Sequence, residues 1–147
     1  MGRSPSDTQV KAWARLVWAS QTVTGRIESD LKAAGMPPLT WYDVLLELER
    51  AKGGALRPRE IAEETLFTRY NVTRLIDRME RKGLVRRVPC PEDARGALVE
   101  ITDAGRTLRK DMWPVYAAAL QKHFADKLND DEADQLAELL GALLTRE

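Results

Sequence analysis

The stretch from Pro58 to Thr102 constrains the fold of this chain more than any other part of it. It has the sequence PREIAEETLFTRYNVTRLIDRMERKGLVRRVPCPEDARGALVEIT. Two short runs with helical spacing of apolar residues are joined by a tight turn, and two runs with β-branched residues follow. This order predicts a helix, a turn, a second helix and then a β-hairpin.

The second of these helices is expected over 69–82. Its apolar residues fall at the spacing i, i+3, i+4 and i+7, which predicts one buried stripe: Val72, Leu75, Ile76 and Met79. The opposite side then carries polar and basic residues, with Asn71 near its margin: Arg69, Tyr70, Thr73, Arg74 and Arg78. Thr68 is the expected N-cap, and Gly83 is the expected terminator.

The first helix of the pair is expected to begin at Pro58, where the missing N–H has no cost. Ile61, Ala62 and Leu66 are expected to face inward. The preceding Arg57 has no capping oxygen, which predicts a weak helix start. The hairpin strands are expected over 84–88 and 97–101, with PCPEDARG between them as turn. Because successive strand residues point to opposite faces, only one of Arg86 and Arg87 should face a bound partner.

Four further helices complete the expected fold, which is mainly α with a small β wing (α+β). They are predicted over 7–34, over 40–51 with Thr40 as cap, from Thr102 to about 127 with a kink at Pro114, and after Asn129 or Asp130. The first helix and the last two helices have more apolar surface than one small head can cover. We therefore expect them to pack against a second copy of the chain, in a twofold homodimer.

The charge of the chain is balanced overall but unevenly distributed. The 147 residues, enough for one domain, contain 23 basic and 23 acidic side chains. Residues 57–87 contain nine Arg or Lys and five Asp or Glu, a net charge of +4, so the remainder carries −4. From 126 to 147 there are seven acids and two bases. A basic centre in a neutral protein is typical of a surface that faces phosphates.

Several function classes have no support in the sequence. Cys90 is the only cysteine and His123 the only histidine, so neither a disulfide framework nor a zinc site is expected. No nucleophile–base arrangement, phosphate-binding glycine loop or metalloprotease motif is present, so we expect no enzyme and no cofactor. The N-terminus lacks the apolar region of a secretory signal, and the apolar run at 115–120 is too short to span a bilayer. We expect a soluble cytoplasmic protein with no membrane contact.

Three strings in the chain resemble the MarR family of bacterial winged-helix transcriptional regulators. They are VTRLIDRMERKGLVRR (72–87), PEDAR (91–95) and LVEITDAGRTL (98–108). The resemblance implies one domain over 1–147, with a winged helix-turn-helix head over 40–102 and dimerisation helices over 7–34 and 103–147. It also implies a DNA-binding regulator, most often a repressor, that binds a pseudo-palindromic operator on double-stranded DNA. Two departures are that Arg57 stands where the family usually has Ser or Thr, and that 7–34 contains no cysteine.

The candidate DNA-binding residues follow from the exposed helix face and the hairpin. Arg reads guanine, Asn reads adenine, and Thr contacts a thymine methyl group or a phosphate in the major groove. Arg95 is the expected wing-tip residue for the minor groove, Asp93 is expected to orient a nearby Arg, and Arg59 is a further phosphate candidate. The predicted set is Arg57, Thr68, Arg69, Tyr70, Asn71, Thr73, Arg74, Arg78, Arg86, Arg87, Asp93 and Arg95.

Two further hypotheses and one rival function stay open at the level of sequence. Aromatic residues and a methionine predict either an effector pocket for a small aromatic ligand or ordinary core and dimer packing: Trp13, Trp18, Met36, Trp41, Tyr42 and Trp113. Cys90, in the expected wing turn, is either a redox-sensitive thiol or a tolerated surface thiol. The rival function is a winged-helix module that binds proteins without DNA readout.

Overall fold

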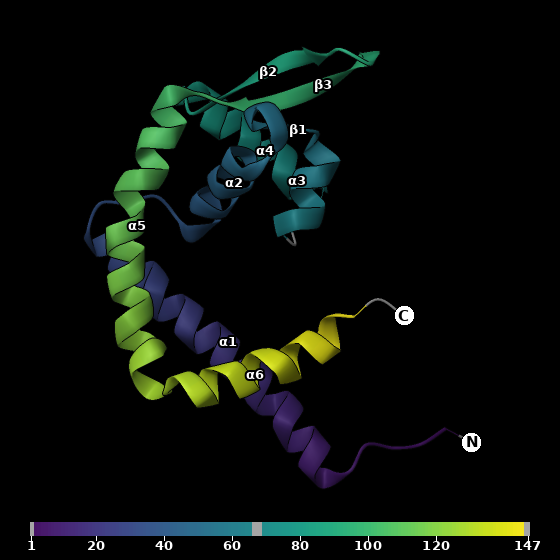
Figure 1. Cartoon of the computed structure of the whole chain (residues 1–147), viewed down its shortest axis with the longest axis vertical. Coiled ribbons are helices and arrows are strands. Elements are labelled where there is room, and N and C mark those ends of the chain that lie inside the picture. The colour runs from purple at the N-terminus through teal and green to yellow at the C-terminus, as the bar shows by residue number, and fades with distance from the viewer. Residues whose placement is uncertain (1, 66–68, 146–147) are drawn as a thin grey trace. The chain divides into compact units, whose positions relative to one another are not determined.

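The structure is a computed structural model that describes residues 2–65 and 69–145, and it is mainly helical with one small sheet (Figure 1). The mainly α prediction with a small β wing is therefore confirmed. The helices are α1 (Asp7–Ala33), α2 (Leu39–Arg50), α3 (Pro58–Thr65), α4 (Arg69–Arg81), α5 (Asp103–His123) and α6 (Asp130–Leu144), with short 3-10 turns at Lys52–Gly54 and Ala125–Lys127. The strands are β1 (Ala55–Leu56), β2 (Val85–Cys90) and β3 (Asp93–Ile101).

The chain divides into two compact units. Residues 31–115 form one unit, and residues 1–30 together with 116–147 form the other. Both α1 and α5 contribute residues to each unit, and α5 continues through Pro114. The sequence places the boundaries of the head at 40 and 102 instead, and its division into head and dimerisation helices stays a prediction.

The core of the 31–115 unit forms where the apolar stripe of α4 packs on α2, α3 and the sheet. Val72, Ile76 and Met79 have no exposed surface, and Leu75 is almost fully buried. The sequence prediction of this stripe is confirmed, as is the burial of Ile61 on α3. The other members of the cluster are Val44, Leu45, Leu48, Ala62, Leu84, Val85, Val99 and Ile101.

The sheet has three antiparallel strands in the order β1-β3-β2. The β2–β3 hairpin, here called the wing, is longer than predicted because pairing continues to Cys90 opposite Asp93, past a register shift after Pro89. Most of the segment predicted as turn is therefore strand. The sequence also missed β1, whose two residues pair only with Val99 and Glu100.

The helix ends follow local hydrogen bonding, with one correction. Thr40 is not the cap of α2, because that helix starts at Leu39 after Pro38, which makes no side-chain cap bond. Two other caps are confirmed. The Thr102 hydroxyl accepts from the Gly105 N–H at 3.1 Å. Asn129 and Glu132 form a reciprocal capping box at the start of α6.

The 1–30 and 116–147 unit leaves much of its apolar surface uncovered. No residue of α6 is buried, and Leu139 and Leu143 are 69% and 68% exposed. On α1, Trp13 and Trp18 are 66% and 75% exposed. One polar contact inside this unit joins α1 to α5, where His123 Nε2 lies 2.8 Å from Asp30 Oδ2. The excess apolar surface expected from the sequence is present on both helices.

Gly105 is required by a close backbone approach at the start of α5. An ideal Cβ on this residue would lie 2.2 Å from the Leu84 carbonyl oxygen and 2.8 Å from Ile101 Cγ1. The same Leu84 carbonyl accepts a hydrogen bond from the Thr102 N–H at 3.1 Å, so it cannot move away without losing that bond. The glycine thus allows α5 to begin directly against the base of the wing.

We expect Gly105→Ala to lower the free energy of unfolding by about 3 kcal/mol, because the added methyl group collides with backbone that cannot shift. Gly141→Ala in α6 is the matched control, since a Cβ there has nothing within 4 Å. It should raise the free energy of unfolding by about 0.5–1 kcal/mol through helix propensity. Urea denaturation at a fixed protein concentration measures both. Equal effects of the two substitutions would contradict the close approach.

Candidate nucleic-acid interface

The exposed face of α4 lies opposite its buried stripe. The side chains of Asn71, Thr73, Arg74 and Arg78 are exposed, as is that of Arg81 one turn after Asp77. These five side chains are polar or basic, and the acids Asp77 and Glu80 beside them on α4 are paired with Arg87. Arg69 and Tyr70 lie in the first turn of α4. Their side chains, together with Thr68 and Leu66, lie outside the described residues.

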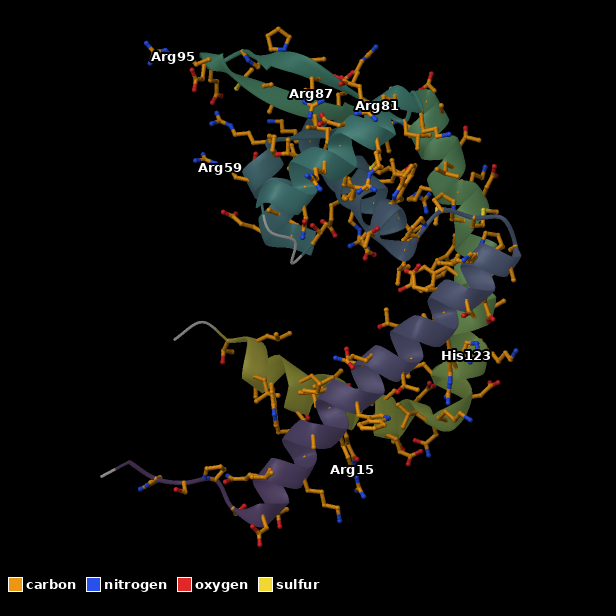
Figure 2. All side chains as sticks on the ribbon, turned by 180° about the vertical axis from the view of Figure 1, so that it is seen from behind. Arg15, Arg59, Arg81, Arg87, Arg95 and His123 are labelled. Carbon is orange, nitrogen blue, oxygen red and sulfur yellow. The ribbon has the colours of Figure 1, made fainter. Side chains whose placement is uncertain are left out.

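The outer end of the wing carries a second exposed cation. Figure 2 shows Arg95 extending from the tip of the β2–β3 hairpin and Arg59 extending from α3. Asp93 Oδ1 accepts a hydrogen bond from the Arg95 backbone N–H at 3.0 Å. Asp93 therefore shapes the turn that presents Arg95, as the sequence prediction that it orients an arginine requires, although it does so through the backbone.

The Arg87 side chain is half-buried and points toward α4. Its Nη2 lies 2.6 Å from Asp77 Oδ1, and its Nη1 lies 2.7 Å from Glu80 Oε1. Its backbone N–H also donates to Glu80 Oε2 at 3.0 Å. These contacts hold the base of β2 against α4. Asp77 and Glu80 were not predicted from the sequence as partners of the wing. The only available signal was that two acids lie on the side of α4 that turns toward the following strand.

Arg86 points to the other face of the sheet, as strand alternation predicts. Its guanidinium forms an ion pair with Glu100 on β3, and its Nε donates to Glu100 Oε1 at 2.8 Å. The Arg86 side chain is 65% exposed. A cavity of about 510 Å³ lies beside it, lined also by Gly53, Thr102, Asp103 and Arg106. Of the two neighbouring arginines, Arg86 thus has the more solvent-exposed guanidinium group.

Arg57 and Cys90 meet where the wing passes the start of α3. Arg57 Nη2 donates to Cys90 Sγ at 3.5 Å. The expectation that Cys90 is a surface thiol is wrong, because only 7% of the residue is exposed. At the start of α3, Glu60 Oε1 accepts a hydrogen bond from the Arg57 backbone N–H at 2.9 Å. This contact fixes the Arg57 backbone, and the weak helix start expected from the missing capping oxygen stays a prediction.

The six proposed pocket residues are divided between the two units. Trp13 and Trp18 belong to residues 1–30, whereas Met36, Trp41, Tyr42 and Trp113 belong to residues 31–115. Tyr42 is buried and stacks on Trp113 with ring centroids 6.2 Å apart. A second cavity, of about 490 Å³, is lined by residues of α6 and by none of these six. An effector pocket built from them stays a prediction.

The described part of the chain holds neither a metal site nor a membrane-spanning helix. Within 2–65 and 69–145, no three His, Cys, Asp or Glu side chains are grouped so as to hold a metal ion. Over the same residues, no helix is both long and apolar enough to cross a membrane. The basic face of α4 and the wing thus remain the surface with the clearest chemical character.

Comparison with known sequences points to one family. A family model described as "MarR family" matches residues 34–96. The chain is 31% identical to the uncharacterised HTH-type transcriptional regulator YkoM of Bacillus subtilis, over 83% of this chain and 77% of YkoM. It is 28% identical to the transcriptional repressor MprA of Escherichia coli, over 79% of this chain and 65% of MprA.

Comparison with solved structures gives the same fold. AbsC, a MarR family transcriptional regulator from Streptomyces coelicolor, superposes with a TM-score of 0.85 at 27% identity, covering 97% of this chain and 95% of AbsC. A mutant of MarR from E. coli, in complex with operator DNA, superposes with a TM-score of 0.80 at 25% identity, covering 97% of this chain and all of that MarR chain.

The neighbouring arginines of β2 should differ in their effect on stability. Arg87→Ala removes two ion pairs that are partly screened by solvent, so we expect it to lower the free energy of unfolding by about 1 kcal/mol. Arg86→Ala removes one more exposed pair and should cost less than about 0.5 kcal/mol. Chemical denaturation of both variants at one protein concentration checks this order. The reverse order would mean that the wing is not held through Asp77 and Glu80.

Proposed function

Because this chain belongs to the MarR family of transcriptional regulators, and not to a class of enzymes, we propose that it is a sequence-specific repressor that binds double-stranded DNA as a homodimer. The observation that carries the proposal is the division of α4 into two faces. Its apolar stripe is buried in the core, while Asn71, Thr73 and Arg74 are exposed side by side near its N-terminal end. In helix-turn-helix proteins the N-terminal residues of the second helix contact base edges.

The residue types on α4 suit direct readout of the major groove. An Arg side chain can bond guanine O6 and N7, and an Asn side chain can bond adenine N6 and N7. Thr73, between them, offers a methyl group and a hydroxyl to a thymine or a phosphate. Arg78 and Arg81 lie further along the same helix and are proposed to contact phosphates, which fix the register of the protein on DNA.

The wing supplies a second contact of a different kind. Arg95 lies at the hairpin tip and its side chain is exposed. A guanidinium at such a tip suits the narrow minor groove of A·T-rich DNA, where the negative potential is strongest. We assign Arg95 to that groove, and Arg86 and Arg59 to the phosphates beside it. Arg87 is assigned to holding the wing, because its guanidinium is already engaged by two carboxylates.

The uncovered apolar surface of α1 and α6 supports a homodimer. Large apolar side chains exposed together on a protein surface mark an interaction site. No residue of α6 is buried within the chain. A surface of a second copy would remove the apolar side chains of its leucine stripe from water. A twofold dimer would present two copies of α4 to one operator.

Repression and ligand response are the finer parts of the proposal. Repression is supported by the similarity to MprA, which is described as a transcriptional repressor. A dimer that occupies an operator would act by excluding other proteins from that DNA. The hypothesis of a small aromatic effector is supported by Trp113, which is 46% exposed and stacks on the buried Tyr42. Such a ligand would release DNA only if it favours the state of the protein that does not bind DNA.

The rival function, a winged helix that binds proteins without DNA readout, is tested by selecting bound DNA from a random pool. We expect a pseudo-palindrome with half-site centres about 10 bp apart, one helical turn. Affinity for it should fall by about a thousandfold or more between 50 and 200 mM salt, because phosphate contacts release counterions. A selection that yields no enriched motif would favour the protein-binding alternative.

Substitutions at Arg74 and Arg95 should separate base reading from backbone contact. Arg74→Ala should cost about 1–3 kcal/mol at particular base pairs and relax specificity there. Arg95→Ala should weaken binding to all sequences, lower the salt slope by about one and reduce the preference for A·T flanks. Lys122→Ala, which removes an exposed cation outside the proposed interface, is the control. Fluorescence anisotropy over a panel of single-base operator variants measures all three.

Light scattering at micromolar concentration should give about twice the chain mass of 16.6 kDa. Leu139→Glu should shift the mass toward the monomer, because a carboxylate cannot be buried in an apolar interface without a partner. Gln135→Glu, which adds the same charge to α6 at a position that is already polar, should leave the mass unchanged. A monomer in the unsubstituted protein would refute the dimer and the paired half-sites.

A further inference from the structure

The outer half of the wing lacks the support that its base has. The third strand, β1, pairs with β3 only at Val99 and Glu100. Beyond those residues, from 88–90 on β2 and 93–98 on β3, the wing is a two-stranded hairpin. An isolated two-stranded hairpin is at best marginally stable in water. A contact with the rest of the 31–115 unit is therefore needed to fix the direction in which the tip points.

The burial of Cys90 shows where such a contact is made. The next residues along the chain, Pro91, Glu92 and Asp93, are exposed, whereas Cys90 is 7% exposed. Across the hairpin, an ideal Cβ on Gly96 would lie 3.6 Å from Cys90 Cβ, which is ordinary van der Waals contact, so Gly96 lies directly against Cys90. The register shift after Pro89 coincides with this point. The hairpin thus turns one side chain inward just before its tip.

Arg57 is the group that meets this side chain. It is the residue directly after β1 and directly before α3, and its backbone N–H is fixed by Glu60 Oε1 at 2.9 Å. From that fixed point its guanidinium reaches the outer wing and donates from Nη2 to Cys90 Sγ at 3.5 Å. A thiol sulfur is a weak acceptor, and a charged donor strengthens the bond. The contact therefore links the start of α3 to the wing at a place that β1 does not reach.

We propose that Arg57 and Cys90 form a positioning pair that sets the direction of the wing, and hence the place of Arg95 on DNA. This inference rests on the proposed DNA-binding function, and it moves Arg57 from a phosphate contact to a residue that acts through the wing. The base of the wing is held by the contacts of Arg87 with Asp77 and Glu80 of α4. The outer half is held by the contact of Cys90 with Arg57, the residue before α3. Two separate arginines then fix one hairpin at two points.

Amide hydrogen exchange tests the positioning without DNA. In Arg57→Met, which keeps an apolar stem and removes the donors, the amides of 88–98 should exchange about threefold to tenfold faster, as expected for one lost hydrogen bond. Cys90→Ala should speed exchange of the same amides by a similar factor. Cys90→Ser keeps an acceptor for Arg57, so its amides should exchange as slowly as those of the unsubstituted protein. Amides of α4 from 72 to 79 serve as the internal control. Unchanged exchange in 88–98, or an equal rise in α4, would overturn the proposal.

A double-mutant cycle on DNA tests the consequence for Arg95. If Arg57 positions the wing, Arg95→Ala should cost at least about threefold less affinity in the Arg57→Met background than in the unsubstituted protein. Arg74→Ala should cost the same in both backgrounds, because α4 does not depend on the wing contact. Additive effects of Arg57 and Arg95 would overturn the proposal. Failure of the unsubstituted protein to bind any selected DNA would instead refute the proposed function, and the exchange experiment would still decide the contact.

Discussion

The burial of one apolar stripe on α4 determines which face of that helix is exposed to solvent. Val72, Ile76 and Met79 have no exposed surface, so the helix cannot rotate about its axis without exposing them to water. At about 25 cal/mol per Å² of apolar surface, exposing even one such side chain costs about 1.5–3 kcal/mol. The position of the polar face is therefore a consequence of the core, and no contact on that face is needed to hold it.

The wing depends on the same core for its base and on charged side chains for its direction. Val85 and Ile101 pair at the inner end of β2 and β3, and both are buried. Next to this apolar pair Arg87 contacts two carboxylates of α4, and further out Arg57 contacts the Cys90 thiol. The apolar contacts supply stability, and the polar contacts supply a fixed geometry. A hairpin that must reach out from the core could not be held by apolar packing along its full length.

The sequence predicted the elements well because they depend on local periodicity. The stripe of α4, the starts of α3 and α5 and the capping of α6 by Asn129 all follow from residue spacing and cap chemistry, and all are confirmed. The order of helices and hairpin, with its resemblance to the MarR family, gave the fold and the class of protein.

What the sequence could not predict are the contacts between segments far apart in the chain. β1 has two residues, too few for a periodic signal, and it exists because β3 offers it an edge. Cys90 contacts Arg57, 33 positions earlier in the chain, and Arg87 contacts two acids of α4. The turn residues around Cys90 predicted a loop. The strand pairing there crosses a register shift, so the sequence shows no regular alternation of apolar and polar residues that would have indicated a strand. Proline and glycine in that segment therefore misled the assignment.

The adjacent arginines of β2 have a consequence for strand register. A slip of one residue in β2 would exchange Arg86 and Arg87 between the two faces of the sheet. Acids lie on both faces, Glu100 on one and Asp77 with Glu80 on the other, so the arginine that moves into its neighbour's position would still meet a carboxylate. The other arginine would move away from both ion-pair sites, and Val85, which is 1% exposed, would turn out of the core. Ion pairing and apolar burial therefore favour the same alignment, and the two arginines reinforce the register that Val85 sets.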